Sequence, residues 1–322
     1  MTIQFSSQFA YKLTDPRQQP AIRATMSALC DAAKEISALC AQGPLIGGLG
    51  ATTGAENADG DSQKALDVQS DEIIIERLRQ APVAYYASEE EEGINTLNPD
   101  APLCVAADPL DGSSNIDTNV SIGTIFSIFP TAPGPAENSF FRSGDEQLVG
   151  GFFVYGPQTT LIVTCGDGVE LYVLEPESKQ FVLAIANLYL TESRAEYGIN
   201  SANARHWQTS IQTFINDCLT GENGPLGENY NMRWVGSLVA DASRILSRGG
   251  IFLYPGDNRP GYEKGRLRQL YEANPVSFVI EQAGGSATDG KTRILELPLN
   301  ELHQRVPFVF GSKKQVELVS NY

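Results

Sequence analysis

The chain has 322 residues, a length typical of about two domains, and 42% of these residues are hydrophobic, as in ordinary globular proteins. No apolar run approaches the roughly 20 residues of a membrane-spanning helix, so we predict no membrane partner. The formal net charge of -16 argues against a nucleic-acid partner, because a phosphate backbone binds to a basic surface.

The five cysteines are scattered along the chain and form no CxxC pair. This spacing predicts free thiols rather than a disulfide framework or a zinc site. The first residues lack the basic start and apolar core of a secretory signal, and we therefore expect a cytoplasmic protein.

The first predicted element is an amphipathic helix. Apolar residues recur at three- and four-residue steps from Ile22 to Cys40, and the helix is expected to end before Gly43. The Gly-rich stretch that follows, to about residue 62, contains GGLG but no subsequent Gly-Lys-Ser/Thr, so we expect a loop rather than a nucleotide-binding P-loop.

A second helical pattern covers residues 64–80. It is followed by two short apolar runs, 83–87 and 103–107, which predict buried strands. Four consecutive glutamates, Glu89 to Glu92, come directly after the first of these strands. A solvated acidic turn is the simpler interpretation of such a run, because adjacent like charges repel unless they are solvated or neutralised. Their position nevertheless allows them to converge with acidic residues at the end of the next strand.

Asp108 and Asp111 follow the second strand, and open α/β sheets bind ligands at strand ends. Gly112 allows the backbone to approach a ligand closely, and Ser113 and Ser114 can open a helix whose free amides suit an anion. Asp-Gly alone is an ordinary turn and serine an ordinary N-cap. The complete string DPLDGSSN favours a site for a metal ion beside a phosphate. Carboxylates without His or Cys favour magnesium or manganese, which would also reconcile the acidic chain with an anionic substrate.

The middle of the chain predicts an antiparallel or mixed sheet, because several β-rich runs between residues 123 and 184 are separated by turn residues. The insert 131–146 is expected to be a loop. Past residue 190 helices alternate with strands, which indicates a second, α/β domain. Its expected helices are 205–219, 237–248 and 267–283, and its expected strands are 249–255 and 306–310.

The string DPLDGSSNID, preceded by SEEE and followed by GRLRQLYEANP, resembles class I fructose-1,6-bisphosphatase. The segments KALDVQSDE, VSIGTIF, RWVGSLVAD, GGIFLYP, EQAGG and LHQR also occur in the order expected of that family. The shorter signature DPxDGS alone implies only the wider superfamily of magnesium-dependent phosphatases. The resemblance implies a mixed α/β fold, the layered α-β-α-β-α sandwich of the sugar phosphatases. We divide it into an N-terminal domain with the DPLDGSS segment, 1–190, and a C-terminal sugar-phosphate-binding domain, 191–322.

The resemblance also implies a site for two or more Mg²⁺ or Mn²⁺ ions in each subunit. The implied ligands are Glu89, Glu90, Asp108, Asp111, Glu272 and the backbone carbonyl of Leu110. Asp67 and Glu90 are implied to deprotonate the attacking water, and Asp61 to lie on a loop that closes over the site. The implied 1-phosphate site consists of Asp111, Gly112, the backbone amides of Ser113 and Ser114, and Arg268.

A distal pocket for the 6-phosphate is implied as well, with one arginine that reaches across from a neighbouring subunit. Three positions match the family, Asn200, Arg233 and Tyr254, and three depart from it, Asn203, Trp234 and Arg266. Tyrosines are common at the first two departures and a lysine is usual at the third. Trp and Asn still donate hydrogen bonds, and Arg can bind phosphate through two parallel hydrogen bonds. The pocket is therefore altered rather than lost.

The function that the resemblance implies is hydrolysis of the 1-phosphate of fructose 1,6-bisphosphate in gluconeogenesis or the Calvin cycle, by a homotetramer. Three alternatives stay open at this point. The enzyme could also take sedoheptulose 1,7-bisphosphate, or it could resemble an inositol monophosphatase. The chain could also be a non-catalytic regulator that keeps the metal-binding fold.

Overall fold

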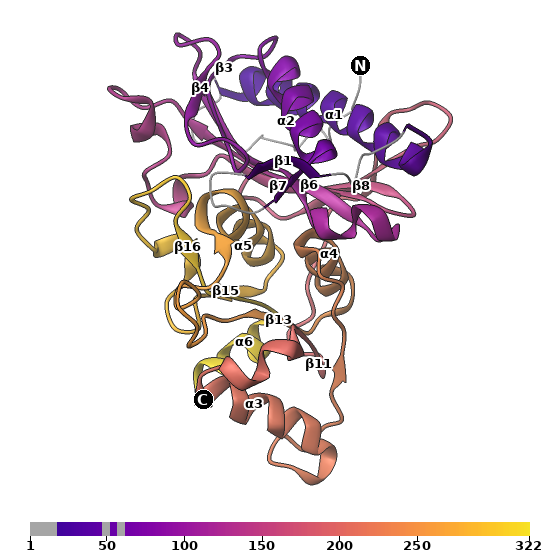
Figure 1. Cartoon of the computed structure of the whole chain (residues 1–322), viewed down its shortest axis with the longest axis vertical. Coiled ribbons are helices and arrows are strands. Elements are labelled where there is room, and N and C mark those ends of the chain that lie inside the picture. Colours follow the sequence, from indigo (N-terminus) through magenta and orange to yellow (C-terminus); the bar gives the residue numbers. More distant parts are fainter. Residues whose placement is uncertain (1–17, 47–51, 57–61) are drawn as a thin grey trace.

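The computed structural model describes residues 18–46, 52–56 and 62–322. Within them, helices and sheets alternate in five layers (Figure 1). Two helices lie on an eight-stranded sheet, two more separate this sheet from a five-stranded sheet, and the last two cover the far face of the second sheet. The prediction of a mixed, layered α/β fold is confirmed.

The outer helices of the first layer are α1 (Gln19–Gln42) and α2 (Ala65–Leu78), close to their predicted bounds. The apolar side of α1 is buried from Ile22 to Ile36, as the three- and four-residue spacing predicts. Gly43, in a positive-φ conformation, ends this helix. Both helices pack on the first sheet in one hydrophobic cluster.

The first sheet has the strand order β10-β9-β8-β7-β6-β5-β3-β4. Its strands are β3 (Val83–Ser88), β4 (Ile94–Thr96), β5 (Leu103–Asp111), β6 (Ile122–Pro130), β7 (Val149–Tyr155), β8 (Thr159–Thr164), β9 (Glu170–Leu174) and β10 (Phe181–Ile185). Only β3 and β5 are a parallel pair in this sheet, so it is mixed. Their carboxyl ends therefore meet at one edge of the sheet.

The second sheet has the strand order β12-β11-β13-β17-β15. Its strands are β11 (Glu196–Ile199), β12 (Asn231–Met232), β13 (Ile251–Tyr254), β15 (Ser286–Thr288) and β17 (Phe308–Gly311). The helices α4 (Leu238–Arg248) and α5 (Asn274–Gln282) fill the space between the sheets, in a cluster that combines residues of both. The helices α3 (Thr209–Thr220) and α6 (Lys313–Ser320) pack on the outer face.

Short helical turns complete the described chain. They are η2 (Gly43–Ile46), η3 (Ser113–Thr118), η4 (Ala136–Ser139), η5 (Gly144–Glu146), η6 (Ser201–His206), η7 (Gly221–Asn223) and η9 (Ile294–Glu296). The expected loop 131–146 thus contains two such turns. In the described part of the chain every helix is too short or too polar to cross a bilayer. The division of the chain after residue 190 stays a prediction.

Two expectations about elements were wrong in part. The stretch predicted as a loop contains the strand β1 (Thr52–Glu56), and its antiparallel partner β2 (Ser62–Lys64) begins where that loop was expected to end. The helix predicted from residue 267 begins later, because β14 (Leu267–Arg268) pairs with β16 (Arg305–Val306) and a π-helical turn, η8 (Gln269–Ala273), precedes α5. Apolar periodicity did not reveal the turn, since all five of its residues are buried.

Candidate active site

The ends of the parallel strands β3 and β5 form one wall of a cavity of about 440 Å³. The Glu89 amide donates to the Ala107 carbonyl at 3.0 Å, which continues the pairing just beyond β3. The lining residues of this cavity are Lys64, Asp67, Glu89, Glu90, Asp108, Leu110, Asp111, Gly112, Ser113, Ser114, Arg266, Arg268 and Glu272. The structure thus brings together all of the residues that the sequence singled out for the metal and the 1-phosphate.

An irregularity at the end of β5 directs its two aspartates into this cavity. The register with β6 shifts between Asp108 and Asp111, as in a β-bulge. The Leu110 amide donates to Asp108 Oδ1 at 2.9 Å, which stabilises the kink. Gly112 follows with φ +82°, and a Cβ there would lie 2.8 Å from the Cβ of Ser237. Glycine is therefore required at this position for both its conformation and its size.

Asp108, Asp111 and Glu272 form the centre of the cavity. All three are buried, and one carboxylate oxygen from each lies within 4.8 Å of the others. Burial and the nearby carboxylates raise the pKa of Asp108 and of Glu272 well above the usual range. Such closely spaced, buried carboxylates repel one another unless a cation lies between them, and hard oxygen donors suit Mg²⁺ or Mn²⁺. The donor set therefore fits a divalent metal site.

The N-terminus of α4 holds the carboxylate of Asp111. Ser237 Oγ donates to Oδ2 at 2.7 Å, and the amides of Leu238 and Val239 donate to Oδ1 and Oδ2 at 3.1 and 2.9 Å. Burial raises the pKa of Asp111 to about 6, and these hydrogen bonds oppose a larger shift. Negative charge is favoured at a helix N-terminus, so α4 orients a carboxylate that comes from the other sheet.

Arg268 joins the acidic turn after β3 to the π-helical turn. Its Nη1 lies 2.9 Å from Glu89 Oε1, and its amide donates to Glu272 Oε2 at 2.5 Å. Both side chains of the ion pair are largely buried, where a charge-assisted hydrogen bond is strong and the loss of one partner is costly. Arg268 thus fixes two carboxylates that are 183 positions apart in the sequence.

Asp67 enters the cavity from the first turn of α2. Its Oδ2 accepts a hydrogen bond from the Lys64 amide at 2.8 Å, while its buried Oδ1 has no hydrogen-bond partner within the described residues. Burial is the main cause that raises the pKa of Asp67 to about 6, and the charge of Glu89 raises it further. An oriented carboxylate with a raised pKa, and with one oxygen that has no partner among the described residues, has the properties of a general base.

The segment after Gly112 offers backbone amides to an anion. Ser113 and Ser114 line the cavity as the first residues of η3, and the Asn115 amide closes the turn onto the Gly112 carbonyl at 2.8 Å. Arg266 and Arg268 also line the cavity and contribute positive charge. The arrangement places anion donors beside the carboxylate cluster.

Of the six distal residues, Arg266 lines this cavity and the other five do not. Asn200 directly follows β11, and Tyr254 is the last residue of β13. Because these two strands are parallel, both residues lie at one edge of the second sheet. Asn200 caps η6, which contains Asn203, and Arg233 is exposed. Trp234 stacks on Phe252 with ring centroids 5.4 Å apart, and Tyr254 lies near the charges of Arg266 and Glu272. Asp61 lies outside the described residues.

Sequence reasoning missed two residues of the site, Lys64 and Ser237. Lys64 lines the cavity and its Nζ pairs with Asp117 Oδ2 at 3.1 Å. Ser237 is the N-cap of α4, and the sequence pattern that predicts a helix over 237–248 also identifies it as a cap. No sequence signal shows that this cap contacts Asp111, 126 positions earlier.

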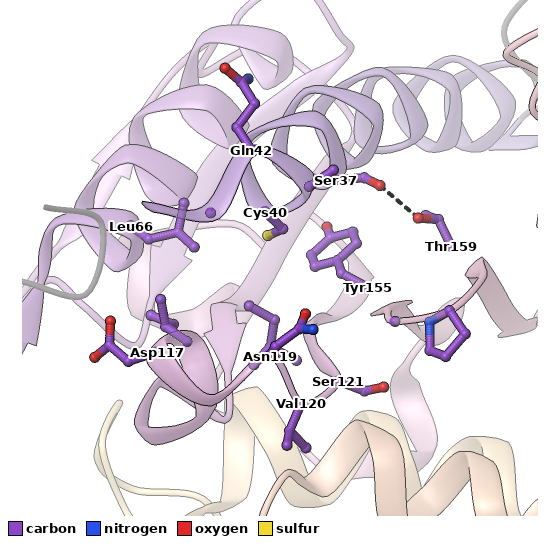
Figure 2. Close-up of a pocket in the computed structure, with 16 residues that line it drawn as sticks. Ser37, Cys40, Gln42, Leu66, Asp117, Asn119, Val120, Ser121, Tyr155 and Thr159 are labelled. Atoms are coloured by element: carbon purple, nitrogen blue, oxygen red, sulfur yellow. Dashed lines mark hydrogen bonds between the residues drawn. The ribbon is translucent and has the colours of Figure 1, made fainter. Parts of the chain in front are cut away.

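A second, larger cavity of about 810 Å³ lies between the end of α1, the segment after η3, and the turn between β7 and β8 (Figure 2). Figure 2 shows Cys40, Leu66 and Tyr155 on one side and Asn119 to Ser121 on the other. Its described lining residues include no lysine or arginine, so it offers no cationic partner to a phosphate. The smaller cavity is therefore the better candidate for chemistry on a phosphate ester. Lys64 and Asp117 connect the two.

Comparison with known proteins gives consistent results over nearly the whole chain. Residues 7–186 match the model of the fructose-1-6-bisphosphatase N-terminal domain, and residues 190–322 match that of the C-terminal domain. The class 1 fructose-1,6-bisphosphatase of Azorhizobium caulinodans is 51% identical over 94% of this chain and 93% of its own length. A relative from Xanthobacter autotrophicus is 50% identical over the same shares. The solved holo form of Leishmania major fructose-1,6-bisphosphatase superposes with a TM-score of 0.89 at 34% identity, covering 96% of this chain and 95% of that one.

Proposed function

The chain belongs to the class 1 fructose-1,6-bisphosphatases, and we propose that it hydrolyses the 1-phosphate of D-fructose 1,6-bisphosphate, giving fructose 6-phosphate and inorganic phosphate. The observation that carries this proposal is the juxtaposition, in one cavity, of three buried carboxylates with the Gly112-Ser113-Ser114 turn and Arg268. A divalent cation and a phosphate have opposite charges, and this cavity offers donors for both.

The proposed cofactor is Mg²⁺ or Mn²⁺, with two or more ions in each subunit. The proposed ligands are Glu89, Glu90, Asp108, Asp111, Glu272 and the carbonyl of Leu110. Bound ions would neutralise charge on the phosphate and lower the pKa of a water molecule. The raised pKa values of the buried cluster support this proposal, since they indicate negative charges without sufficient compensation.

In the proposed mechanism Asp67 takes a proton from the attacking water at Oδ1, and Glu90 assists it. A base whose pKa is about 6 is mostly unprotonated at neutral pH yet still accepts a proton readily. The Lys64 amide keeps Oδ2 in place, and the proposal requires that Oδ1 face the attacking water. Asp61, on its loop, is proposed to complete the site.

The remaining residues orient the substrate for in-line attack. We assign the 1-phosphate to Gly112, the amides of Ser113 and Ser114, and Arg268. As the bond from the water oxygen to phosphorus forms, the bond from phosphorus to the sugar oxygen breaks. We assign the 6-phosphate end to Asn200, Asn203, Arg233, Trp234, Tyr254 and Arg266.

Phosphate release from fructose 1,6-bisphosphate tests this proposal directly. We expect rapid release with Mg²⁺, loss of release with EDTA, and recovery when excess Mg²⁺ is added. An inositol monophosphate is the control substrate and should react much more slowly, because it has no second phosphate for the distal residues. No chelator-sensitive release from any of these substrates would instead favour a non-catalytic, metal-binding regulator.

Sedoheptulose 1,7-bisphosphate is a second candidate substrate. The residue that motivates this test is Trp234. Its ring stacks on Phe252 at an interplanar angle of 10°, and its centroid lies 6.1 Å from that of the Tyr254 ring. Core packing thus fixes an indole where family members commonly have a phenol, and the distal end loses that hydroxyl. The ratio of kcat/KM for the two bisphosphates decides between a fructose-specific and a bifunctional enzyme.

The setting of the reaction is also part of the proposal. We place the enzyme in the cytoplasm, in gluconeogenesis or the Calvin cycle, as a homotetramer of two-domain subunits divided after residue 190. The proposal requires that Arg233 be accessible to a neighbouring subunit, and its side chain is exposed. Light scattering from the purified protein measures the oligomeric state, and a monomer that is fully active would contradict it.

A further inference from the structure

The acidic turn after β3 has to hold two adjacent carboxylates, Glu89 and Glu90, at the wall of the cavity. Glu91 follows them directly, and repulsion among these neighbouring charges favours their separation. Metal ligands nevertheless need a fixed geometry, which hydrogen bonds from outside the ligand set normally provide. The question is which residues hold this turn.

The first support comes from Asp71 on α2, one helical turn after Asp67. Asp71 is buried, and its Oδ1 accepts hydrogen bonds from Tyr86 Oη and Ser88 Oγ, both at 2.7 Å. Ser88 Oγ in turn accepts the Glu90 amide at 3.2 Å. A continuous chain of hydrogen bonds therefore leads from a buried carboxylate, through the Ser88 hydroxyl, to the backbone of the proposed ligand Glu90.

The second support comes from His303, in the LHQR segment that the proposed mechanism does not use. His303 Nε2 lies 3.0 Å from the carbonyl oxygen of Glu91. A carbonyl only accepts, so this nitrogen carries the hydrogen and donates it. The His303 ring also packs beside Tyr271, with centroids 5.3 Å apart. His303 thus secures the far side of the turn from the C-terminal part of the chain.

We propose that Asp71 and His303 are positioning residues, which fix the turn Ser88–Glu91 so that Glu89 and Glu90 can bind the divalent metal. Neither residue lines the cavity. The inference rests on the proposed function, because it assumes that this turn contributes metal ligands. A positioning role differs from a purely structural role in one measurable respect. A variant of a positioning residue should lose more metal affinity than its loss of stability predicts.

Two measurements on the 322-residue protein test this inference. Electron paramagnetic resonance measures the affinity for Mn²⁺, and thermal unfolding in EDTA measures the stability without metal. Ser88→Ala breaks the connection to Glu90 and Asp71→Ala removes its anchor. Loss of such an outer partner typically weakens metal binding by about 10- to 100-fold. Asp71→Asn keeps an acceptor oxygen for Ser88 and should stay within about three-fold of wild type.

Tyr86→Phe is the matched control for these variants. It removes the other hydroxyl from the same Asp71 oxygen but leaves the link from Ser88 to Glu90 intact. We therefore expect some loss of stability with Mn²⁺ affinity within about two-fold of wild type. If Asp71→Ala does not fold, Ser88→Ala and Ser88→Thr, which loses and keeps the hydroxyl respectively, make the same comparison.

His303 is tested by a pair of variants. His303→Gln keeps a donor near the position of Nε2, whereas His303→Leu has none, so only the leucine should weaken Mn²⁺ binding by about three-fold or more. Equal Mn²⁺ affinity in Ser88→Ala, His303→Leu and wild type would overturn the inference. A wild-type protein that binds no Mn²⁺ would instead contradict the proposed function itself.

Discussion

The two ends of the proposed substrate site differ in how completely the chain assembles them. At the 1-phosphate end, residues from α2, the turn after β3, β5 and the π-helical turn line one cavity, and its central carboxylates are buried. At the 6-phosphate end, Asn200 and Tyr254 lie at one edge of the second sheet and Arg233 is exposed. The first end is therefore the more completely assembled of the two.

The electrostatics of the two ends explain this difference. Among the described residues, six carboxylates line the cavity, Asp67, Glu89, Glu90, Asp108, Asp111 and Glu272, together with three cationic side chains, Lys64, Arg266 and Arg268. Such a cluster keeps its geometry only through fixed hydrogen bonds, as those on Asp111 show. A phosphate pocket made of arginine and amide groups needs no such preorganisation, because exposed cations are well solvated and can adjust to the ligand.

The largest effect is expected at the preorganised end. Asp111→Ala removes a buried carboxylate and leaves the donors at the start of α4 without their acceptor. We expect kcat to fall by at least about 100-fold, on the scale of a lost electrostatic stabiliser at roughly 3 kcal/mol. Steady-state phosphate release measures this, and Glu177→Ala, an exposed acid far along the chain, is the control. A near-normal rate in Asp111→Ala would refute the proposed site.

The next largest effect is expected at the exposed end. Arg233→Ala should raise KM for fructose 1,6-bisphosphate by about 10-fold with a smaller change in kcat, because it removes a charge-assisted contact rather than a reacting group. If Arg233 serves a neighbouring subunit, mixing Arg233→Ala with Asp111→Ala subunits should restore part of the activity. Mixtures that are no more active than their components would show that each subunit uses its own arginine.

The sequence predicted the preorganised end better than the exposed end, for a physical reason. Asp108 and Asp111 end a buried apolar strand, and the parallel neighbour of that strand ends before Glu89, so strand patterning alone brings these residues to one edge. Periodicity predicted most of the individual helices and strands, whereas the layered arrangement followed only from the resemblance to the family. The start of α5 did not, because Arg268 and Gln269 pair with residues of the segment 304–306 that only the folded chain brings near. The contact of Ser237 with Asp111 is equally non-local.

The buried carboxylates also predict how stability depends on pH without metal. Burial raises the pKa of Asp67 and of Asp111 to about 6 from 3.8 in the unfolded chain. Between about pH 4 and 6 the folded protein therefore binds more protons than the unfolded chain, and its free energy of unfolding falls as the pH rises. The decrease is at most about 3 kcal/mol for each carboxyl group.

Thermal unfolding in EDTA at pH 5 and pH 7.5 measures this dependence. We expect a lower Tm at the higher pH, and a smaller difference with Mg²⁺, which stabilises the charged form. An Asp111→Asn variant should show a weaker pH dependence in EDTA, because one titrating group is gone. A Tm that rises with pH in EDTA would mean that ionisation of the buried carboxyl groups does not destabilise the folded protein.

The smallest effect is expected where the exposed end meets the core. Trp234 is held by stacking on Phe252, and its neighbour Tyr254 already provides a phenol. Trp234→Tyr restores the hydroxyl that is common in the family, and one added hydrogen bond should change the ratio of kcat/KM for fructose and sedoheptulose bisphosphates by about two- to ten-fold. Trp234→Phe is the matched control, because it changes the ring in the same way without a hydroxyl. If both variants shift the ratio equally, ring size rather than hydrogen bonding sets the preference for sugar length.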